Sequence, residues 1–426
     1  MIKRYCARRL VLLLQVVAVL LPAIGSCSPA SARVHPERLG PLLRTVAVSL
    51  AIEDPGGDAM QAFYESLMRT EAVERPGVTR IIHYGDSHVA ADLLTGELRR
   101  RFQTGFGDAG PGFIPGGRPW QPYGVRGARI STSAGWEPLG IRPSPGTDRK
   151  FGLAGLSVEA HRSDEWIRVE AACRHFELYL LSQPGGGAVD VLLDGQMYGG
   201  RVSLASERAA AAYIEVTAQG ESFHTVELRT ISSGAVRVLG FVVERGGVGV
   251  IYDAFGINGA RAARLLEWDR DVLINNLGHR SPSLIIVAYG SNEAGDADLD
   301  FEEYGRTFSA ALRRLRAGAP QASLLVVSPP DRAVLVNGKW QTIARMPGLV
   351  AVQRKAALSS GAAFWDFFSA MGGAGSIQRW ASHPQPLAQP DRVHLTREGY
   401  KVEAEMLYAA LMRGYLWELA RWSGGI

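Results

Sequence analysis

Two stretches of the chain alternate apolar runs with amphipathic helical patterns. In the first, Thr79 to Tyr84 predicts a buried strand that stops at Gly85, and apolar residues at helical spacing follow from Val89 to Phe102. After Gly247 the same alternation resumes and predicts four further strands separated by helices. Five consecutive β/α units predict a parallel sheet with helices on both faces. The four later strands are expected at residues 248–255, 283–289, 323–328 and 362–367, with helices from about residue 260, at 301–317, after 328 and at 396–421.

The stretch between them has a different pattern. Glycine and proline dominate from Gly105 to about Gly152, and short segments of alternating polarity follow. Such segments, separated by turns, predict an antiparallel β-sandwich. The predicted organisation is one α/β domain, residues 33–107 and 248–426, interrupted by a sandwich at residues 108–247. The alternating segments are residues 166–169, 176–180, 189–193, 213–216, 224–228 and 236–243.

The first 32 residues predict a targeting sequence rather than part of the fold. Basic residues come first, and an apolar run from Leu10 to Ile24 follows that is short for a membrane span. Ala30-Ser31-Ala32 then resembles a signal-peptidase site, while Ile24 to Cys27 resembles a bacterial lipobox. We therefore expect an exported protein of the periplasm or cell envelope, either free or lipid-anchored at Cys27.

Removal of this segment changes the charge balance. Four of the 46 basic residues and none of the 42 acidic residues lie in it, which leaves 42 of each. No Lys/Arg cluster remains that would bind nucleic acid or hold a membrane electrostatically. Cys6, Cys27 and Cys173 do not predict a disulfide framework, and no Cys or His spacing predicts a metal site. We expect no metal, no cofactor and no nucleic-acid partner, and membrane contact only through an anchor at Cys27.

Polar residues follow the ends of the predicted strands. Ser87 follows the first strand, Gly259 the second and Asn292 the third, while Asp391 and His394 lie between the fifth strand and the last helix. In a parallel sheet these connections meet at the carboxyl edge, where α/β proteins place their chemistry. A serine nucleophile needs a base, the base needs an orienting carboxylate, and the oxyanion needs converging donors.

Ser87 taken alone also has a simpler interpretation, since serine at a helix N-terminus is a common N-cap. The other residues favour a nucleophile. Asp391 can hold one imidazole nitrogen of His394 while the other faces Ser87. The backbone N–H groups of Ser87 and Gly259, with the Asn292 amide, can then form an oxyanion hole.

These stretches resemble the sequence blocks of the SGNH, or GDSL-like, hydrolase superfamily. The resemblance implies a flavodoxin-like three-layer α/β/α fold, a Ser87–His394–Asp391 triad and the oxyanion hole just described. Two residues depart from the usual pattern: Glu293 stands where the superfamily usually has Asp, and His88 stands where many members have an apolar residue. The blocks are Gly85-Asp86-Ser87, Gly256 to Gly259, Gly290 to Asn292, and Asp391 to His394.

The chain is most similar to the peptidoglycan O-acetylesterases of the Gram-negative envelope. It shares their Gly-Asp-Ser-His block, and Gly259 lies 172 positions after Ser87, a separation large enough for an inserted carbohydrate-binding-module-like sandwich. The resemblance implies an esterase that hydrolyses O-acetyl esters on an acetylated glycan, with peptidoglycan foremost, through an acyl-enzyme. Two alternatives stay open: an O-acetyltransferase with the same acyl-enzyme, and a glycan-binding protein on a hydrolase scaffold.

Several nearby features have structural interpretations. We expect His83 and His88 to be structural histidines and Asp86 to cap or hold the nucleophile loop. The unpatterned stretch from Gly372 to Pro390 predicts either a lid or a plain connection. We also expect the sandwich to join the α/β domain at the rim that carries Ser87, where it would hold polymeric substrate.

Overall fold

A five-stranded parallel sheet forms the centre of the α/β part. The computed structural model describes residues 50–72, 77–116, 127–140, 148–220 and 222–422, so the expected signal peptide and Cys27 lie outside the described residues. The strand order is β14-β1-β15-β16-β19, and Gly85 is in register with both Gly256 and Ala288. The carboxyl ends of three neighbouring strands therefore lie level. The strands are β1 (Val78–Gly85), β14 (Gly249–Gly256), β15 (Leu284–Ala288), β16 (Ser323–Val327) and β19 (Ala363–Trp365).

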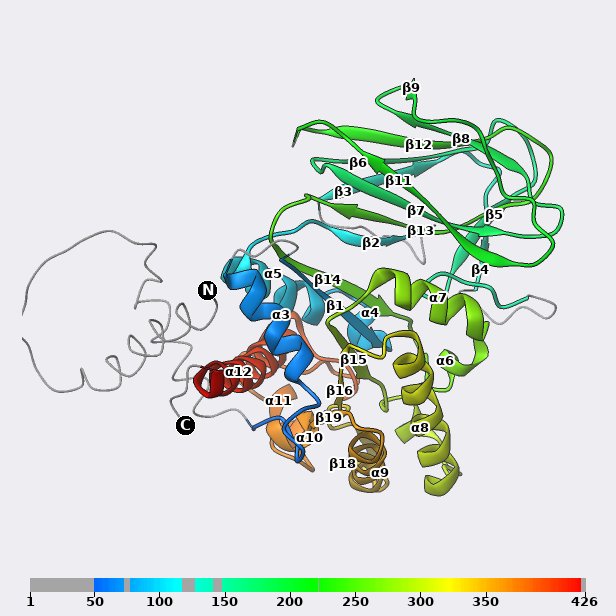
Figure 1. Cartoon of the computed structure of the whole chain (residues 1–426). Helices are drawn as coiled ribbons and strands as arrows, with labels where there is room; N and C mark the ends of the chain where they lie inside the picture. The colour runs from blue at the N-terminus through cyan, green and yellow to red at the C-terminus, as the bar shows by residue number, and fades with distance from the viewer. Residues whose placement is uncertain (1–49, 73–76, 117–126, 141–147, 221, 423–426) are drawn as a thin grey trace, which may run out of the picture.

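Helices cover both faces of this sheet (Figure 1). Successive strand residues point to opposite faces: Ile82 packs with α7, α8 and α9, whereas Ile81 packs with α3, α5 and α12. This arrangement confirms the predicted flavodoxin-like three-layer architecture. The helices are α3 (Gln61–Glu71), α5 (Leu94–Phe106), α7 (Arg270–Arg280), α8 (Phe301–Gly318), α9 (Met346–Ser359) and α12 (Arg397–Trp422).

Two helices that the pattern predicts as continuous are each broken in two. The helix expected up to Phe102 consists of α4 (Ser87–Ala90) and α5, with Asp92 between them at a φ of 51°. The helix expected from about residue 260 consists of α6 (Arg264–Glu267) and α7, and Asp269 caps the second. Hydrophobic spacing alone cannot show such breaks, because capping side chains decide them.

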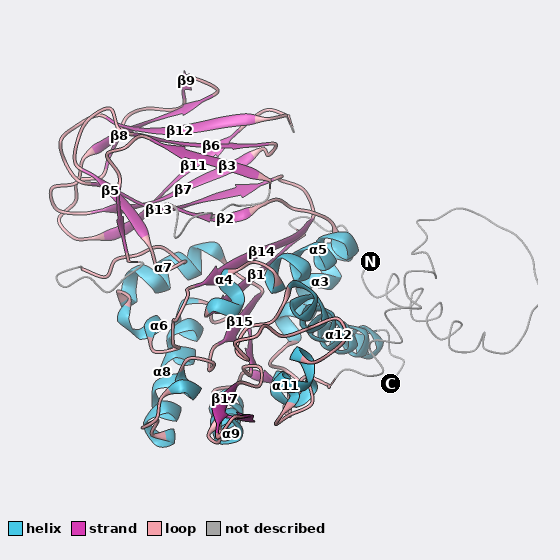
Figure 2. Ribbon diagram, turned by 180° about the vertical axis from the view of Figure 1, so that it is seen from behind, coloured by secondary structure: helices cyan, strands magenta, loops and turns pink. Residues whose placement is uncertain are grey.

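The stretch between α5 and β14 forms two antiparallel six-stranded sheets packed face to face (Figure 2). All six predicted segments are strands, and side chains such as Val169, Leu178 and Val238 fill the space between the sheets. These sheets are compatible with the predicted inserted sandwich. The longer strands are β6 (Trp166–Ala171), β7 (His175–Ser182), β8 (Ala188–Leu193), β11 (Ala210–Thr217), β12 (His224–Thr230) and β13 (Val236–Glu244).

The sandwich and the α/β part share one hydrophobic cluster. Phe113, Tyr179 and Leu239 of the sandwich pack in the same cluster as Tyr84 and Trp268 of the α/β part. The two parts are therefore in continuous contact. The exact domain boundaries expected at residues 108 and 247 stay a prediction.

The sandwich joins the sheet at its amino end. Asp108 forms a bridge with Val250, and Gly249 pairs with Val78 at the start of β1. The expectation that the junctions lie on the Ser87 rim is wrong, because α5 carries the chain back along the sheet before the sandwich begins. A sandwich loop still contacts the start of α7, where the Asp269 N–H donates to the Arg149 carbonyl at 2.8 Å.

A β-hairpin that the sequence pattern did not predict lies between β16 and α9. Its strands are β17 (Ala333–Val336) and β18 (Lys339–Thr342). The turn residues Asn337 and Gly338 have φ values of 48° and 73°, which suit a two-residue hairpin. Three of the four β17 residues are exposed, so the strand lacks the buried alternation that reveals most strands.

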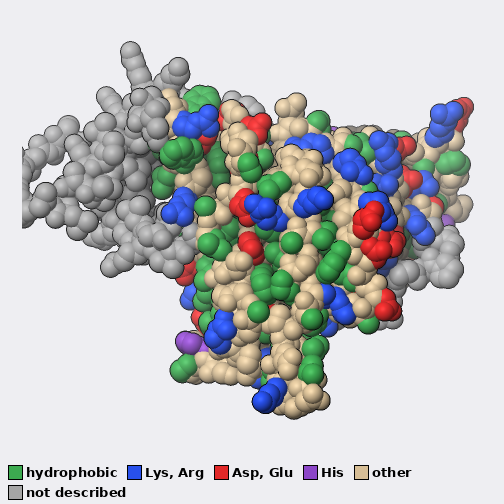
Figure 3. Space-filling model, turned by 90° about the horizontal axis from the view of Figure 1, so that it is seen from below, with side chains coloured by type: hydrophobic (Ala, Val, Ile, Leu, Met, Phe, Trp, Pro, Cys, Tyr) green, Lys and Arg blue, Asp and Glu red, His purple; other side chains and the backbone are tan. Residues whose placement is uncertain are grey.

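The surface seen from below carries mixed side chains (Figure 3). Lysine and arginine lie among aspartate and glutamate, with hydrophobic side chains between them. This mixture fits the near balance of 46 basic and 42 acidic residues. Within the ranges that the structure describes, no helix combines the length and the apolar character needed to cross a membrane.

Candidate active site

Ser87 lies where β1 passes into the short helix α4. Asp86 caps this helix, because its Oδ1 accepts the His88 N–H at 3.0 Å. Ser87 is the first helical residue rather than the cap, so the N-cap interpretation of Ser87 is wrong. The capping role expected for Asp86 is confirmed.

Gly256 lets the serine helix approach the neighbouring strand. A Cβ at Gly256 would lie 2.1 Å from the backbone nitrogen of Ala90 and 2.5 Å from its Cα. Real Cβ atoms do not come this close to backbone, so any larger residue would push α4 away from β14. Glycine at this position therefore sets where Ser87 lies relative to the loop that follows β14.

The three side chains predicted to act together are joined by hydrogen bonds. Ser87 Oγ lies 2.9 Å from His394 Nε2, and Asp391 Oδ2 lies 2.6 Å from His394 Nδ1. Asp391 Oδ1 also accepts the backbone N–H groups of Val393 and His394, each at 3.0 Å. Partial burial raises the pKa of Asp391, but these hydrogen bonds outweigh it and hold the pKa below its ordinary value. The carboxylate is therefore ionised beside the imidazole.

The residues predicted as oxyanion donors lie at the same edge of the sheet. Within the described residues, the N–H groups of Ser87 and Gly259 have no hydrogen-bond partner. Gly259 has a φ of 73°, a value that glycine adopts without strain. Asn292 Nδ2 donates to the Ala260 carbonyl at 2.9 Å and lies 3.4 Å from Asp86 Oδ2. The second contact is long for a hydrogen bond, so this amide hydrogen is available to a bound oxyanion.

A buried acidic layer lies beneath the serine. Burial, with a contribution from the nearby Glu293, raises the pKa of Asp86 to about 7. Burial likewise raises the pKa of Glu293, whose Oε1 accepts the Ala262 N–H at 2.9 Å. Glu293 thus holds the loop that follows Gly259. Glu293, which stands where the superfamily usually has the shorter Asp, therefore makes a structural contact in this fold.

Both nearby histidines have structural contacts, as predicted. Burial lowers the pKa of His83 to about 3, and its Nδ1 lies 2.9 Å from the Tyr252 hydroxyl. Burial also lowers the pKa of His88 to about 3, and its Nδ1 lies 3.0 Å from the Tyr400 hydroxyl. The His88 ring centroid is 5.4 Å from that of His394, so an uncharged ring forms the wall behind the expected base. Sequence reasoning missed Tyr400, because nothing in a helical pattern marks a tyrosine that supports a histidine.

The unpatterned stretch before Asp391 supports the His394 loop. It contains α11 (Ser376–Ala381), and Trp380 packs edge-on against Phe367 with ring centroids 6.1 Å apart. The Gln389 N–H donates to the His394 carbonyl at 2.8 Å. These contacts favour the interpretation of this stretch as a connection rather than a lid.

Ser87, His394 and Asp391 form a hydrogen-bonded series at the carboxyl edge of a doubly wound sheet, an arrangement that is typical of serine hydrolases. Residues 234–402 match the family model described as the GDSL-like Lipase/Acylhydrolase family. The predicted resemblance to the SGNH, or GDSL-like, hydrolases and the prediction of a carboxylic ester hydrolase are confirmed.

The first of three solved structures that match the chain shows the same fold. One described as "Peptidoglycan O-acetylesterase in action, 5 min" is 23% identical and matches with a TM-score of 0.69, covering 83% of this chain and 95% of that chain. A family two carbohydrate esterase from Clostridium thermocellum is 11% identical, with a TM-score of 0.30 over 67% of this chain and 98% of its own. One from Cellvibrio japonicus is 14% identical, with a TM-score of 0.28 over 68% and 99%. No curated protein sequence matches the chain.

Proposed function

We propose that the chain is an exported serine esterase that hydrolyses O-acetyl esters on a cell-envelope glycan, with peptidoglycan as the substrate. The observation that carries this proposal is the series from Ser87 Oγ to His394 Nε2 and from His394 Nδ1 to Asp391, with distances of 2.9 Å and 2.6 Å. A hydroxyl this close to an imidazole nitrogen can transfer its proton as it attacks a carbonyl. The family match of residues 234–402 supports the same class of reaction.

The proposed reaction has two halves. His394 Nε2 takes the Ser87 proton while Oγ attacks the acetyl carbon, and Asp391 stabilises the imidazolium. The tetrahedral oxyanion accepts hydrogen bonds from the Ser87 and Gly259 N–H groups and from Asn292. The bond between the acetyl carbon and the sugar oxygen then breaks, and that oxygen leaves as a hydroxyl with the proton from His394. Water, deprotonated by His394, attacks the acetyl-serine, which releases acetate and restores Ser87.

A structural match and the expected targeting segment support the substrate class. The structure that matches with a TM-score of 0.69 is described as a peptidoglycan O-acetylesterase. The expected targeting segment at residues 1–32 would bring this chain to the compartment of the cell wall, either free or anchored at Cys27. We include in the proposal that the sandwich contacts the glycan, since a second contact raises the effective concentration of a polymer at the serine.

Covalent labelling tests the nucleophile. An organophosphonate with a good leaving group should add to Ser87 Oγ, and mass spectrometry of peptides should locate the adduct. His394→Ala should slow labelling about a hundredfold or more, because the general base is lost. Ser203→Ala, which removes an exposed serine of the sandwich, should label like the wild type. Unchanged labelling of His394→Ala, or an adduct on another residue, would contradict the proposal.

A further inference from the structure

The hairpin β17–β18 exposes apolar side chains next to the catalytic loop. Leu335 is 59% exposed and Trp340 is 36% exposed. The two residues pair directly across the strands, and directly paired residues share one face of a ladder. We call these two side chains the Leu335–Trp340 platform. Grouped exposed apolar side chains often mark a binding surface.

Arg392 joins this platform to the loop that carries the catalytic histidine. Its guanidinium carbon lies 5.1 Å from the centroid of the Trp340 ring, within range of a cation–π contact. The backbone of Arg392 also contacts the hairpin, because its carbonyl accepts the Ala333 N–H at 3.0 Å. Arg392 stands between Asp391 and His394, so the platform is fixed directly beside the imidazole loop.

The hairpin is anchored at its base. Ala333 is buried in the hydrophobic cluster with Trp365. Thr342 Oγ1 donates to Asp331 Oδ1 at 2.8 Å and accepts the Gly375 N–H at 2.7 Å. The exposure of the platform is therefore a feature of a well-supported hairpin and not of a frayed end.

We propose that the Leu335–Trp340 platform is a glycan subsite: Trp340 stacks on a sugar ring of the polymer, and Arg392 binds a carboxylate or hydroxyl group of the polymer. This inference rests on the proposed function, because it names a further contact of the same substrate. The C–H groups on the face of a pyranose ring pack on a flat indole, and its hydroxyls lie at the ring edge. The Arg392 guanidinium beside the ring then suits a glycan that carries carboxylates.

A lipid bilayer is another partner that exposed apolar side chains can bind, but the order of residues in this hairpin does not suit insertion into a bilayer. The turn consists of Asn337 and Gly338, and Lys339 begins the strand that follows. A hairpin that enters a bilayer would carry apolar residues at the turn itself, whereas here the exposed apolar residues lie along the strands. Leu335 and Trp340 form the platform face, and Val334 and Val336, which are 41% and 40% exposed, lie on the opposite face. The observations therefore favour a glycan.

Binding to insoluble peptidoglycan tests the subsite without requiring turnover. We would measure sedimentation of the wild type, Trp340→Ala, Trp340→Phe and Trp417→Ala with de-O-acetylated sacculi and with phosphatidylglycerol vesicles. Trp340→Ala should weaken binding to sacculi about five- to thirtyfold, the usual cost of truncating an anchoring aromatic residue, and Trp340→Phe should recover most of it. Trp417, which is 58% exposed on α12 and about 30 Å along that helix from Arg397, is the matched control and should behave like the wild type.

If Trp340→Ala bound sacculi as tightly as the wild type does, the proposal would be overturned. A loss of binding to vesicles alone would replace the glycan subsite with a lipid contact. For enzyme activity, the ratio of kcat/KM on O-acetylated peptidoglycan to that on a small acetyl ester should fall by a similar factor in Trp340→Ala and not in Trp417→Ala. If the wild type released no acetate, the proposed function would fail, but the sedimentation result would still decide whether the platform binds glycan.

Discussion

Asn292 is the residue whose contacts differ most from those of a dedicated oxyanion donor. Its amide donates to the Ala260 carbonyl at 2.9 Å, and only its longer contact to Asp86 leaves a hydrogen for the substrate. If that hydrogen binds the oxyanion, Asn292→Ala should lower kcat about a hundred- to a thousandfold. Asn275→Ala, an exposed change on α7, is the control. A loss below about tenfold would mean that backbone N–H groups suffice.

Asp86 gives a prediction about how stability depends on pH. Burial and Glu293 raise the pKa of Asp86 from 3.8 to about 7, so the folded protein holds a proton that the unfolded chain releases. The contribution of the protonated Asp86 carboxyl to the free energy of unfolding is full below pH 3.8 and is lost as the pH rises through about 7. Asp86→Asn keeps a cap oxygen for His88 but cannot ionise. Its melting temperature should therefore fall less than that of the wild type between about pH 5 and pH 8.

Thermal unfolding at both pH values would measure this difference. Asp271→Asn, whose side chain is 81% exposed, should follow the wild type. Equal pH dependence in Asp86→Asn and the wild type would show that Asp86 does not hold a proton in the fold.

Among the elements, the junction of α4 and β14 decides whether Ser87 is in place. In Gly256→Ala the new Cβ would meet the Ala90 backbone at 2.1 Å, and α4 would have to move. We expect a loss of stability of about 1–3 kcal/mol and at least a hundredfold loss in kcat/KM, since small displacements of reacting groups are costly. Gly200→Ala, where the added Cβ meets nothing within 4 Å, is the control. Full activity of folded Gly256→Ala would contradict this account of the site.

The elements also show which features a sequence can predict. The five sheet strands were predictable because buried parallel strands are continuous apolar runs, and the site residues because each follows such a run. The break at Asp92 was not, since it depends on a local turn and on the pairing of Asp92 with Arg99 at 2.9 Å. The hairpin at residues 333–342 was not predicted, because most of its apolar residues face solvent and so leave no buried apolar run. Asp86, Glu293 and Tyr400 show their roles only when the fold brings them together.

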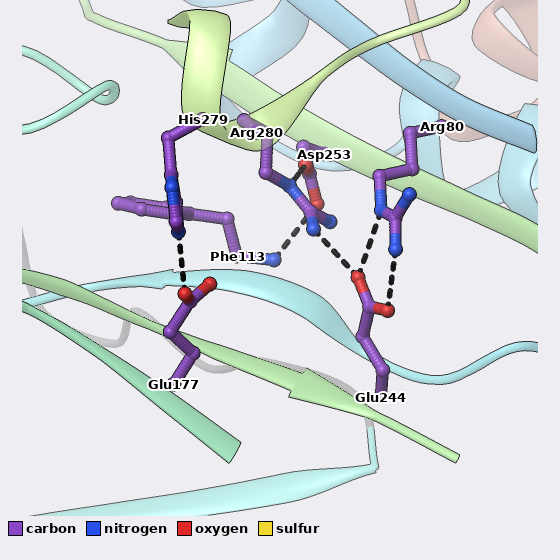
Figure 4. Close-up of polar contacts among 7 residues, drawn as sticks. All are labelled: Arg80, Phe113, Glu177, Glu244, Asp253, His279 and Arg280. Atoms are coloured by element: carbon purple, nitrogen blue, oxygen red, sulfur yellow. Dashed lines mark hydrogen bonds and ion pairs between the residues drawn. The ribbon is translucent and has the colours of Figure 1, made fainter. Parts of the chain in front are cut away.

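In the whole molecule, a buried ion cluster joins the sandwich to the α/β part (Figure 4). Arg280 of α7 donates to Glu244 of β13 at 2.6 Å and to Asp253 of β14 at 2.8 Å. Arg80 of β1 contacts the same Glu244 at 2.8 Å, and Asp253 also accepts the Phe113 N–H at 2.8 Å. Removal of the whole sandwich would take Glu244 away from Arg280 and Arg80 and would uncover the hydrophobic cluster that the two parts share. Point changes such as Trp340→Ala are therefore better tests of substrate positioning than a deletion.

Glu244→Gln tests this junction. Breaking a buried ion pair typically costs about 3–5 kcal/mol, so urea unfolding should show a loss of about 3 kcal/mol at neutral pH. Glu302→Gln, which removes one partner of an exposed pair with Arg306, should cost less than about 1 kcal/mol. Comparable small losses in both variants would mean that the cluster does not hold the two parts together.

The same contact predicts a pH dependence. Burial raises the pKa of Glu244, but Arg280 and Arg80 outweigh it and lower the pKa from 4.5 to about 2. A carboxylate with a lowered pKa stabilises the fold fully above its unfolded pKa and loses that effect as the pH falls through its folded pKa. The difference in unfolding free energy between the wild type and Glu244→Gln should be full above pH 4.5 and vanish towards pH 2. A constant difference would contradict this assignment.

Acetate release from O-acetylated peptidoglycan tests the central claim most directly. It would be measured for the wild type and Ser87→Ala, with acetylated xylan and an oligosaccharide acetyl acceptor in parallel assays. The account predicts that the wild type releases acetate from peptidoglycan faster than it transfers acetyl groups, and that Ser87→Ala lowers the rate about a thousandfold or more. Acetyl transfer that exceeds release would indicate a transferase. Acetate release by folded Ser87→Ala at the wild-type rate would contradict a serine esterase built on Ser87, His394 and Asp391.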